Sequence, residues 1–235
     1  MEILEFKELD STNDELRRLA EKGAANFTVV TAKKQTRGKG RYSRSWESPA
    51  GNIYLSILIR NLDAHTAHQV SFVASLACLE AIQINIPEAE TRLKWPNDVL
   101  ANGKKIAGIL LESASGSDQP DRLNYLIVGF GINVKHSPDY ATNMKALGNT
   151  GSFGNIRDKL LEEFTKYYDI WLEDGFGKIS SLWLKNASGL GEKIVANLEE
   201  KHIEGIFQGL TPGGELVLET SEGKIIISSG EVHAI

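Results

Sequence analysis

Asn102-Gly103 restricts the fold of this chain more than any other short feature, because it separates two apolar runs. An Asn-Gly pair in this setting favours the two-residue turn of a β-hairpin. The turn pairs Ala101 with Lys104, Leu100 with Lys105 and Asp98 with Ala107. Asp98 and Lys105 then become diagonal neighbours on one face, roughly 7–8 Å apart at Cα. We expect an antiparallel hairpin that brings an acid and a lysine into one site, with an exposed ion pair of little energetic value as the alternative.

Residues 123–134 predict a long strand whose two faces differ in character. By the strand period of two, Gly129, Gly131 and Asn133 share one face. Glycines on one face of a buried strand mark the close approach of a ligand or another backbone, and Asn133 could address that ligand. A bulge or a tight bend explains the glycines equally well, so both interpretations stay open.

The segment of residues 35–46, called the basic loop below, has no hydrophobic period and joins expected strands at 27–33 and 52–60. Glycine lets backbone N–H groups approach a ligand closely, and successive N–H groups form a concave anion site. Arginine adds a planar fork that matches phosphate or carboxylate oxygens. The loop therefore predicts a site for a phosphate-bearing small molecule, with a solvated surface loop or a nucleic-acid contact as the alternative. Its cations are Arg37, Lys39, Arg41 and Arg44.

Ser11, Thr12 and Asn13 precede an expected helix that ends near Lys22. Capping accounts for one of the three, with Asp14 completing an approximate capping box. Two polar side chains then remain for a ligand at the helix N-terminus. Further helices are expected over 65–85, 155–173 and 178–186, and a first strand over 3–9.

After residue 188 the chain changes to short alternating strands broken by glycines. This sequence pattern predicts a small antiparallel barrel or sandwich of about 45 residues. We therefore expect an α+β protein with one domain over 1–188 and a small β-barrel domain over 189–235.

Charge and cysteine content exclude several classes of protein. The net charge of -5 argues against a general binder of nucleic acid or anionic membranes. Cys78 is the one cysteine, which excludes an internal disulfide framework, and we expect it to be buried. His65 and His68 have no ligand-spaced partners, so we expect surface residues and no metal site there. No signal peptide or run of 18 apolar residues is present, which favours the cytoplasm.

With the basic loop, the hairpin and the glycine strand in this order, the chain closely resembles the biotin protein ligases over nearly its full length. The matching segments are 10–13 (DSTN), Gln35, 38–41 (GKGR), 94–98 (KWPND), 105–112 (KIAGILLE) and 129–133 (GFGIN). The resemblance implies a class II synthetase-like core, in which helices pack on a mixed, largely antiparallel sheet. It is similar to the short form of the family, because Ser11 leaves no room for a preceding helix-turn-helix, and we expect no DNA-linked repression.

The resemblance implies a two-step reaction. Biotin attacks the α-phosphate of ATP to give biotinyl-5′-AMP and pyrophosphate, and a lysine of a biotin carboxyl carrier protein then takes the biotinyl group. Such adenylation calls for positioned cations and Mg²⁺ rather than a protein nucleophile. The implied partners are biotin, ATP and the carrier protein, without DNA or membrane, in a homodimer built by sheet pairing.

The family's site residues carry over by position. Biotin's ureido head would contact Ser11, Thr12, Asn13 and Gln35, while Lys39, Gly40 and Arg41 would close over its tail and the adenylate phosphate. The nucleotide would contact Gly38, Arg41, Trp46 and Asn133. Catalysis would involve Lys105, which neutralises the meeting anions, Arg41, and Asp98, which orients Lys105 or a magnesium-bound group. We expect the basic loop to be a mobile lid whose cations order when ligand phosphate arrives.

This chain departs from the family pattern at two places. Lys39 replaces the first arginine of the usual Gly-Arg-Gly-Arg loop, and Ser43 replaces a later glycine. The tail from Gly230 to Ile235 also lacks the basic residue often found there, which leaves the role of the C-terminal barrel open. The alternatives are a lipoate-protein ligase, which shares the fold and the adenylate chemistry, and a non-catalytic module whose terminal barrel binds a protein or nucleic acid.

Overall fold

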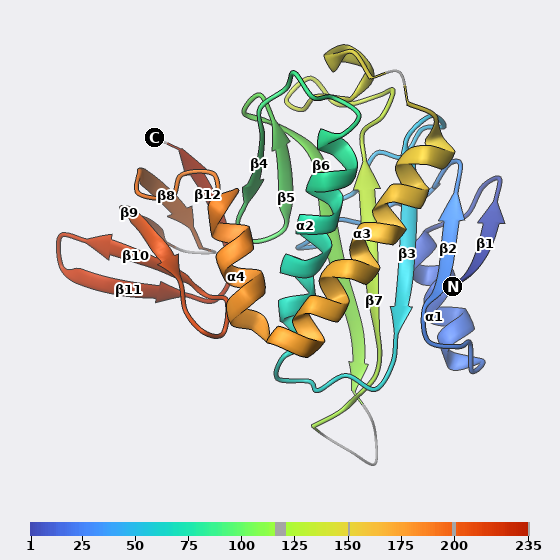
Figure 1. Ribbon diagram of the computed structural model, residues 1–235, viewed down its shortest axis with the longest axis horizontal. Helices are drawn as coiled ribbons and strands as arrows, with labels where there is room; N and C mark the ends of the chain where they lie inside the picture. The colour runs from blue at the N-terminus through green and yellow to red at the C-terminus, as the bar shows by residue number, and fades with distance from the viewer. Residues whose placement is uncertain (116–120, 150, 199–200, 235) are drawn as a thin grey trace.

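A computed structural model describes residues 1–115, 121–149, 151–198 and 201–234, which form a large sheet, a smaller sheet and four α-helices (Figure 1). The seven-stranded sheet has the order β1-β2-β3-β7-β6-β5-β4. Only β1 and β2 pair in parallel, so the prediction of a mixed, largely antiparallel sheet is confirmed. The strands are β1 (Glu2–Phe6), β2 (Thr28–Ala32), β3 (Ile53–Ile59), β4 (Thr91–Lys94), β5 (Asp98–Ala101), β6 (Lys104–Ser115) and β7 (Leu123–Ile132).

Helices pack on both faces of this sheet. One face carries α1 (Thr12–Glu21), and the other carries α2 (Val70–Gln83) and α3 (Phe153–Asp174), which lie side by side in front of the strands in Figure 1. The short helix α4 (Phe176–Lys185) packs against both. Because α2 contacts the sheet, α3 and α4, 11 of its 14 residues are buried. Cys78 is among them, as predicted, and burial raises the pKa of its thiol.

The alternation of β7 divides the core between the two faces. Val128, Phe130 and Ile132 pack in the large cluster beneath α2. Ile127 packs with α1 in a smaller cluster on the opposite face. Since neighbouring strand residues point to opposite faces, Gly129 and Gly131 share one face, as predicted, and it is the face that carries α1.

The smaller sheet is five-stranded and antiparallel, in the order β11-β10-β9-β8-β12, which agrees with the expected small barrel. It lies beside β4 and α4 in Figure 1. Trp95 connects the smaller sheet to the rest of the protein, because the indole N–H of Trp95 donates to the Gly214 carbonyl at 3.2 Å. Its strands are β8 (Lys193–Asn197), β9 (His202–Leu210), β10 (Leu216–Thr220), β11 (Gly223–Ile227) and β12 (Glu231–Ala234).

The β5–β6 hairpin forms at Asn102-Gly103, where both residues have positive φ, 48° and 76°. One detail of the predicted register is wrong. A β-bulge beyond Leu100 shifts the pairing, so Asp98 lies opposite Gly108 instead of Ala107. Elsewhere the elements end within a few residues of their predicted bounds, and β1 stops at Phe6 where residue 9 was expected.

Candidate active site

A cavity of about 740 Å³ opens on the face of the large sheet that carries α1. Its walls come from the N-terminus of α1, the basic loop, the β5–β6 hairpin and β12. Gly108, Gly129 and Gly131 lie along it on the paired strands β6 and β7. The cavity therefore occupies a region where the strands carry no side chain that would fill it.

Each glycine of β7 makes room for a side chain from another element. A Cβ added at Gly129 would lie 2.3 Å from Asn13 Oδ1, and one added at Gly131 would lie 2.6 Å from Trp46 Cε2. The pairing of β7 with β3 continues without a shift past both glycines. Close approach, rather than a bulge, thus explains the glycine face, and the groups that approach are two residues of the predicted site.

Ser11 is the N-cap residue of α1, but its side chain makes no capping hydrogen bond to any described residue. The Ser11 N–H, which a capping box would use, donates to Asp10 Oδ1 at 2.8 Å. Asp14 pairs with Arg17 and Lys39 instead. The prediction that capping occupies one of the three polar residues is therefore wrong, and the buried Ser11 lines the cavity with its two neighbours.

Thr12 and Asn13 are held by groups from three other segments. Gln35 Oε1 accepts from the Thr12 N–H at 2.8 Å, and Asn13 Nδ2 donates to Glu112 Oε2 at 2.7 Å. The Ser56 hydroxyl on β3 lies 2.8 Å from Thr12 Oγ1 and 2.6 Å from Asn13 Oδ1. Because an ionised carboxylate only accepts, Glu112 fixes the orientation of the Asn13 amide. This polar end of the cavity is preorganised.

Lys105 and Asp98 meet at the cavity wall, with Nζ 2.6 Å from Oδ1, so the hairpin brings the acid and the lysine together as predicted. Asp98 Oδ1 is buried, so water screens its attraction to the Lys105 ammonium little. Lys105 Nζ also lies 5.3 Å from the centre of the Trp46 ring, so the ammonium stands between a carboxylate and an indole.

A second lysine and the C-terminal strand complete this end of the cavity. Lys94 opens the 94–98 motif, but no sequence pattern assigned it or this strand a role in the site. Lys94, Glu231 and His233 all line the cavity. Burial lowers the pKa of the Lys94 ammonium, and Lys105 lowers it further while Asp98 opposes the shift. Burial, followed by repulsion from Lys94, lowers the pKa of His233. Glu231 and His233 lie more than 130 residues after Lys94, so only the tertiary fold shows that they meet.

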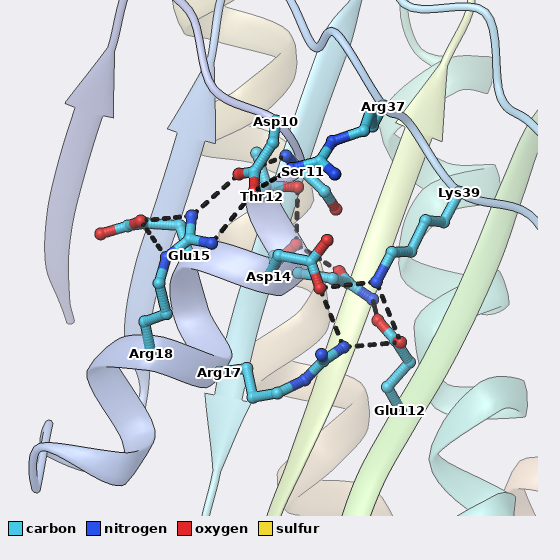
Figure 2. Close-up of polar contacts among 12 residues, drawn as sticks. Asp10, Ser11, Thr12, Asp14, Glu15, Arg17, Arg18, Arg37, Lys39 and Glu112 are labelled. Atoms are coloured by element: carbon cyan, nitrogen blue, oxygen red, sulfur yellow. Dashed lines mark hydrogen bonds and ion pairs between the residues drawn. The ribbon is translucent and has the colours of Figure 1, made fainter.

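The four cations of the basic loop all have protein partners, although we expect from the sequence that they order with ligand phosphate. Figure 2 shows Arg37 beside Asp10, and Lys39 between Asp14 and Glu112. Arg41 donates to Asn97 and to the Gly230 carbonyl, both at 3.3 Å, and Arg44 pairs with Glu231. The loop is thus tied to α1 at one end and to β12 at the other.

The remaining predicted site residues differ in whether they line the cavity and in which hydrogen bonds they make. Gly38 is not among the lining residues, and its carbonyl accepts from the Trp46 N–H at 2.9 Å, so it shapes the loop. Gly40 lines the cavity. Asn133 also lines it and is buried, but its amide donates to the Thr142 carbonyl at 3.1 Å. Trp46 Nε1 is buried without a hydrogen-bond partner among the described residues, which leaves a donor at the cavity.

The described residues contain no group of three or more His, Cys, Asp or Glu that could hold a metal ion. His65 and His68 are exposed, as predicted, and lie near Asp121 and the Gly213 carbonyl. None of the helices in the described ranges is long and apolar enough to cross a membrane.

Known proteins resemble this chain along nearly its whole length. Residues 5–133 match the biotin/lipoate A/B protein ligase family, and residues 189–233 match the biotin protein ligase C-terminal domain. The chain is 37% identical to the biotin–acetyl-CoA-carboxylase ligase of Paracoccus denitrificans, over 95% of this chain and 96% of that protein. It is 34% identical to the bifunctional ligase/repressor BirA of Bacillus subtilis, over 96% of this chain and 71% of that protein.

Among solved structures, the biotin protein ligase of Aquifex aeolicus in complex with biotin and ATP is similar with a TM-score of 0.81 and 31% identity. The similarity covers 99% of this chain and 97% of that one. The same fold therefore holds biotin and ATP in that relative.

Proposed function

The chain belongs to the biotin/lipoate A/B protein ligase family, and from this premise we propose that it is a biotin protein ligase. It activates biotin with ATP to biotinyl-5′-AMP, releases pyrophosphate, and transfers biotin to a lysine of a biotin carboxyl carrier protein. The observation that carries this function is one cavity in which the Lys105–Asp98 pair lies between a preorganised polar end and a basic loop. Adenylation needs this arrangement because it joins two anions.

In the first step a biotin carboxylate oxygen forms a bond to the α-phosphorus, and the bond to pyrophosphate breaks. Lys105 places its ammonium where both anions meet, because Asp98 and the rigid hairpin hold it there. Arg41 reaches the same cavity from the basic loop. Fixed cations of this kind stabilise charge that develops in the transition state without reorganising. We assign the catalytic roles to these three residues.

The polar end suits the ureido ring of biotin, which presents two N–H donors and one carbonyl acceptor. Ser11, Thr12, Asn13 and Gln35 supply hydroxyl and amide groups, and Ser56 and Glu112 hold two of them in fixed orientations. We assign Lys39 and Gly40 to the part of the basic loop that covers the biotin tail. A site whose polar groups are oriented before binding loses less entropy when the ligand arrives.

The opposite end suits the nucleotide. Trp46 offers an indole face and an N–H without a partner among the described residues, and its ring packs closely against Gly131. Asn133 and the Arg41 guanidinium border the same region of the cavity. We assign Gly38 an indirect role, because it shapes the turn that carries Trp46.

Magnesium fits the site as a substrate-borne ion. Mg²⁺ is commonly held by one or two carboxylates together with substrate phosphates, so a three-ligand protein cage is not required. Asp98 places a carboxylate at the cavity, where its Oδ1 lies 2.6 Å from Lys105 Nζ. We propose that Asp98 would hold the ion, whose charge would neutralise phosphate oxygens.

In the second step the neutral amine of the carrier lysine attacks the acyl carbon of biotinyl-5′-AMP. The new C–N bond forms, the bond to the AMP oxygen breaks, and the amide carries biotin. We place both steps in the cytoplasm, where ATP is supplied.

We keep 1–188 and 189–235 as the proposed domains. The division is supported by β8, which begins a separate sheet at Lys193.

We propose that the enzyme forms a homodimer through the edge of the large sheet. Within the described residues, β1 pairs only with β2, so its outer edge offers free backbone groups for a second copy. Light scattering at rising protein concentration measures this directly. If the measured mass stays that of a single chain up to the protein concentration used in the activity assay, the proposed dimer is wrong.

The test of the proposed function is the mass of an apo carboxyl carrier domain after incubation with the protein, ATP, Mg²⁺ and biotin. We expect the mass to rise by one biotinyl group, and we expect no rise when the acceptor lysine is replaced by arginine. Transfer of a lipoyl group in place of biotin would assign the chain to the other branch of its family.

A further inference from the structure

We propose that Asp14 is a positioning residue that, with Glu112, holds Lys39 and so latches the basic loop over the polar end of the cavity. The inference rests on the proposed function for the identity of the ligand beneath the loop. It concerns a residue to which the resemblance assigns no role.

The latch consists of four charged side chains from three segments (Figure 2). Lys39 Nζ lies 2.5 Å from Asp14 Oδ1 and 3.7 Å from Glu112 Oε1. Arg17 NH2 lies 3.0 Å and 2.9 Å from the same two oxygens. Two anions thus alternate with two cations, and the group carries no net charge. Because α1, β6 and the basic loop each contribute, the contact fixes the loop to both elements.

A simple surface pair on α1 would need only Asp14 and Arg17, which are three residues apart. Asp14 also binds the basic loop, since its Oδ1 lies closer to Lys39 Nζ than to Arg17 NH2. The Asp14 side chain is 17% exposed and that of Lys39 36%, so water screens their attraction only in part. Asp14 is therefore the principal anchor of this cation.

Glu112 connects the latch to the ligand-binding end. One of its oxygens faces Arg17 and Lys39, and the other accepts from Asn13 Nδ2. Loss of the Asp14 charge would leave Lys39 with a carboxylate 3.7 Å away that already serves two other donors. The basic loop would then open more often. The start of the loop stays held without Asp14, because Gln35 accepts from the Thr12 N–H at 2.8 Å and the Arg37 N–H donates to the Asp10 carbonyl at 2.8 Å. The ion pair of Arg37 with Asp10, just before α1, adds little because Arg37 is 77% exposed.

The test is limited trypsin digestion of the full chain without ligands, because trypsin cuts after the lysine and arginines of the basic loop. Asp14→Asn is compared with Glu15→Gln, a matched control in the same first turn of α1 whose partner Arg18 does not belong to the loop. We expect Asp14→Asn to accelerate cleavage within 35–46 by about two- to fivefold, the range for one partly exposed ion pair. Glu15→Gln should be cleaved like the wild type.

A double-mutant cycle with Lys39→Gln separates the latch from general stability. Cleavage after Arg41 and Arg44 should rise in Lys39→Gln, and adding Asp14→Asn should raise it no further. Dissociation of biotinyl-5′-AMP should accelerate by the same factor in Asp14→Asn, with the maximal rate of adenylation nearly unchanged.

Equal cleavage of Asp14→Asn and wild type would overturn the latch, and so would equal acceleration and equal thermal destabilisation in both Asp14→Asn and Glu15→Gln. The trypsin and thermal comparisons use no biotin, so their outcome does not depend on the proposed function. If biotin and ATP together gave the wild-type loop no protection from trypsin, the proposed function would fail while the ligand-free comparison still decided the latch.

Discussion

Replacing Gly129 by alanine should disable the biotin end of the cavity while the fold survives. The backbone at Gly129 is ordinary strand with no positive φ, so alanine adopts it without strain. The added Cβ would lie 2.3 Å from Asn13 Oδ1, whereas ordinary contact begins at 3.4 Å. Asn13 would therefore have to move by about 1.1 Å.

The cost of that movement follows from what holds Asn13. The side chain is 4% exposed and bonded to Glu112 at 2.7 Å, and the Ser56 hydroxyl lies 2.6 Å away, so a shift of this size strains both contacts. Each lost hydrogen bond costs about 0.5–1.5 kcal/mol, and overpacking costs about 1–3 kcal/mol. A group misplaced by about 1 Å in an active site can lower activity roughly 100-fold. We expect kcat/KM for biotin to fall about 10- to 100-fold.

The assay is adenylation at varied biotin and at varied ATP, with thermal unfolding as a check on the fold. Gly131→Ala is the matched control, because its Cβ would press on Trp46 at the nucleotide end. Gly129→Ala should raise the KM for biotin, and Gly131→Ala should raise the KM for ATP. The reasoning is refuted if Gly129→Ala leaves the biotin KM unchanged, or if the two variants alter both constants alike.

Three further outcomes are expected. Lys105→Ala should lower adenylate formation by about 100- to 1,000-fold, because a preorganised cation is lost, and near-normal turnover would show that Lys105 and Asp98 are only a surface pair. Arg41→Gly should release biotinyl-5′-AMP faster at unchanged thermal stability, and an unchanged off-rate would remove Arg41 from the lid. A hydrogen bond from Arg18 holds the pKa of Asp10 well below its usual 3.8, against the effect of burial. That stabilisation is fully present above pH 3.8 and is lost as pH falls toward the lower folded value, so the melting temperature of wild type should fall more steeply below about pH 4 than that of Asp10→Asn.

Local signals predicted the parts of the fold that depend on local geometry. Asn102-Gly103 gave the hairpin because positive φ at two successive residues is a property of that dipeptide. The bulge between Val99 and Leu100 has no signal in the hairpin dipeptide, so the exact partner of Asp98 could not be predicted. The ion pair of Asp98 with Lys105 was still predicted, because a long lysine side chain tolerates the shift.

The sequence predicted those site residues that belong to one motif. It did not predict contacts between segments that are far apart in the chain. The period of two placed Gly129 and Gly131 on one face, but which side chains fill that face depends on packing. Capping rules misjudged Ser11, whose side chain makes no capping hydrogen bond to any described residue. The contribution of β12, through Glu231, requires the two sheets to be docked.

The proposed function requires that the cavity join biotin to AMP. Biotin-dependent exchange of labelled pyrophosphate into ATP tests it most directly, because only a reversible adenylation returns the label to ATP. We expect exchange with biotin, little with lipoate, and a loss of about 100-fold or more in Lys105→Ala. Exchange with lipoate but not with biotin, or with neither, would show that the protein is not a biotin ligase.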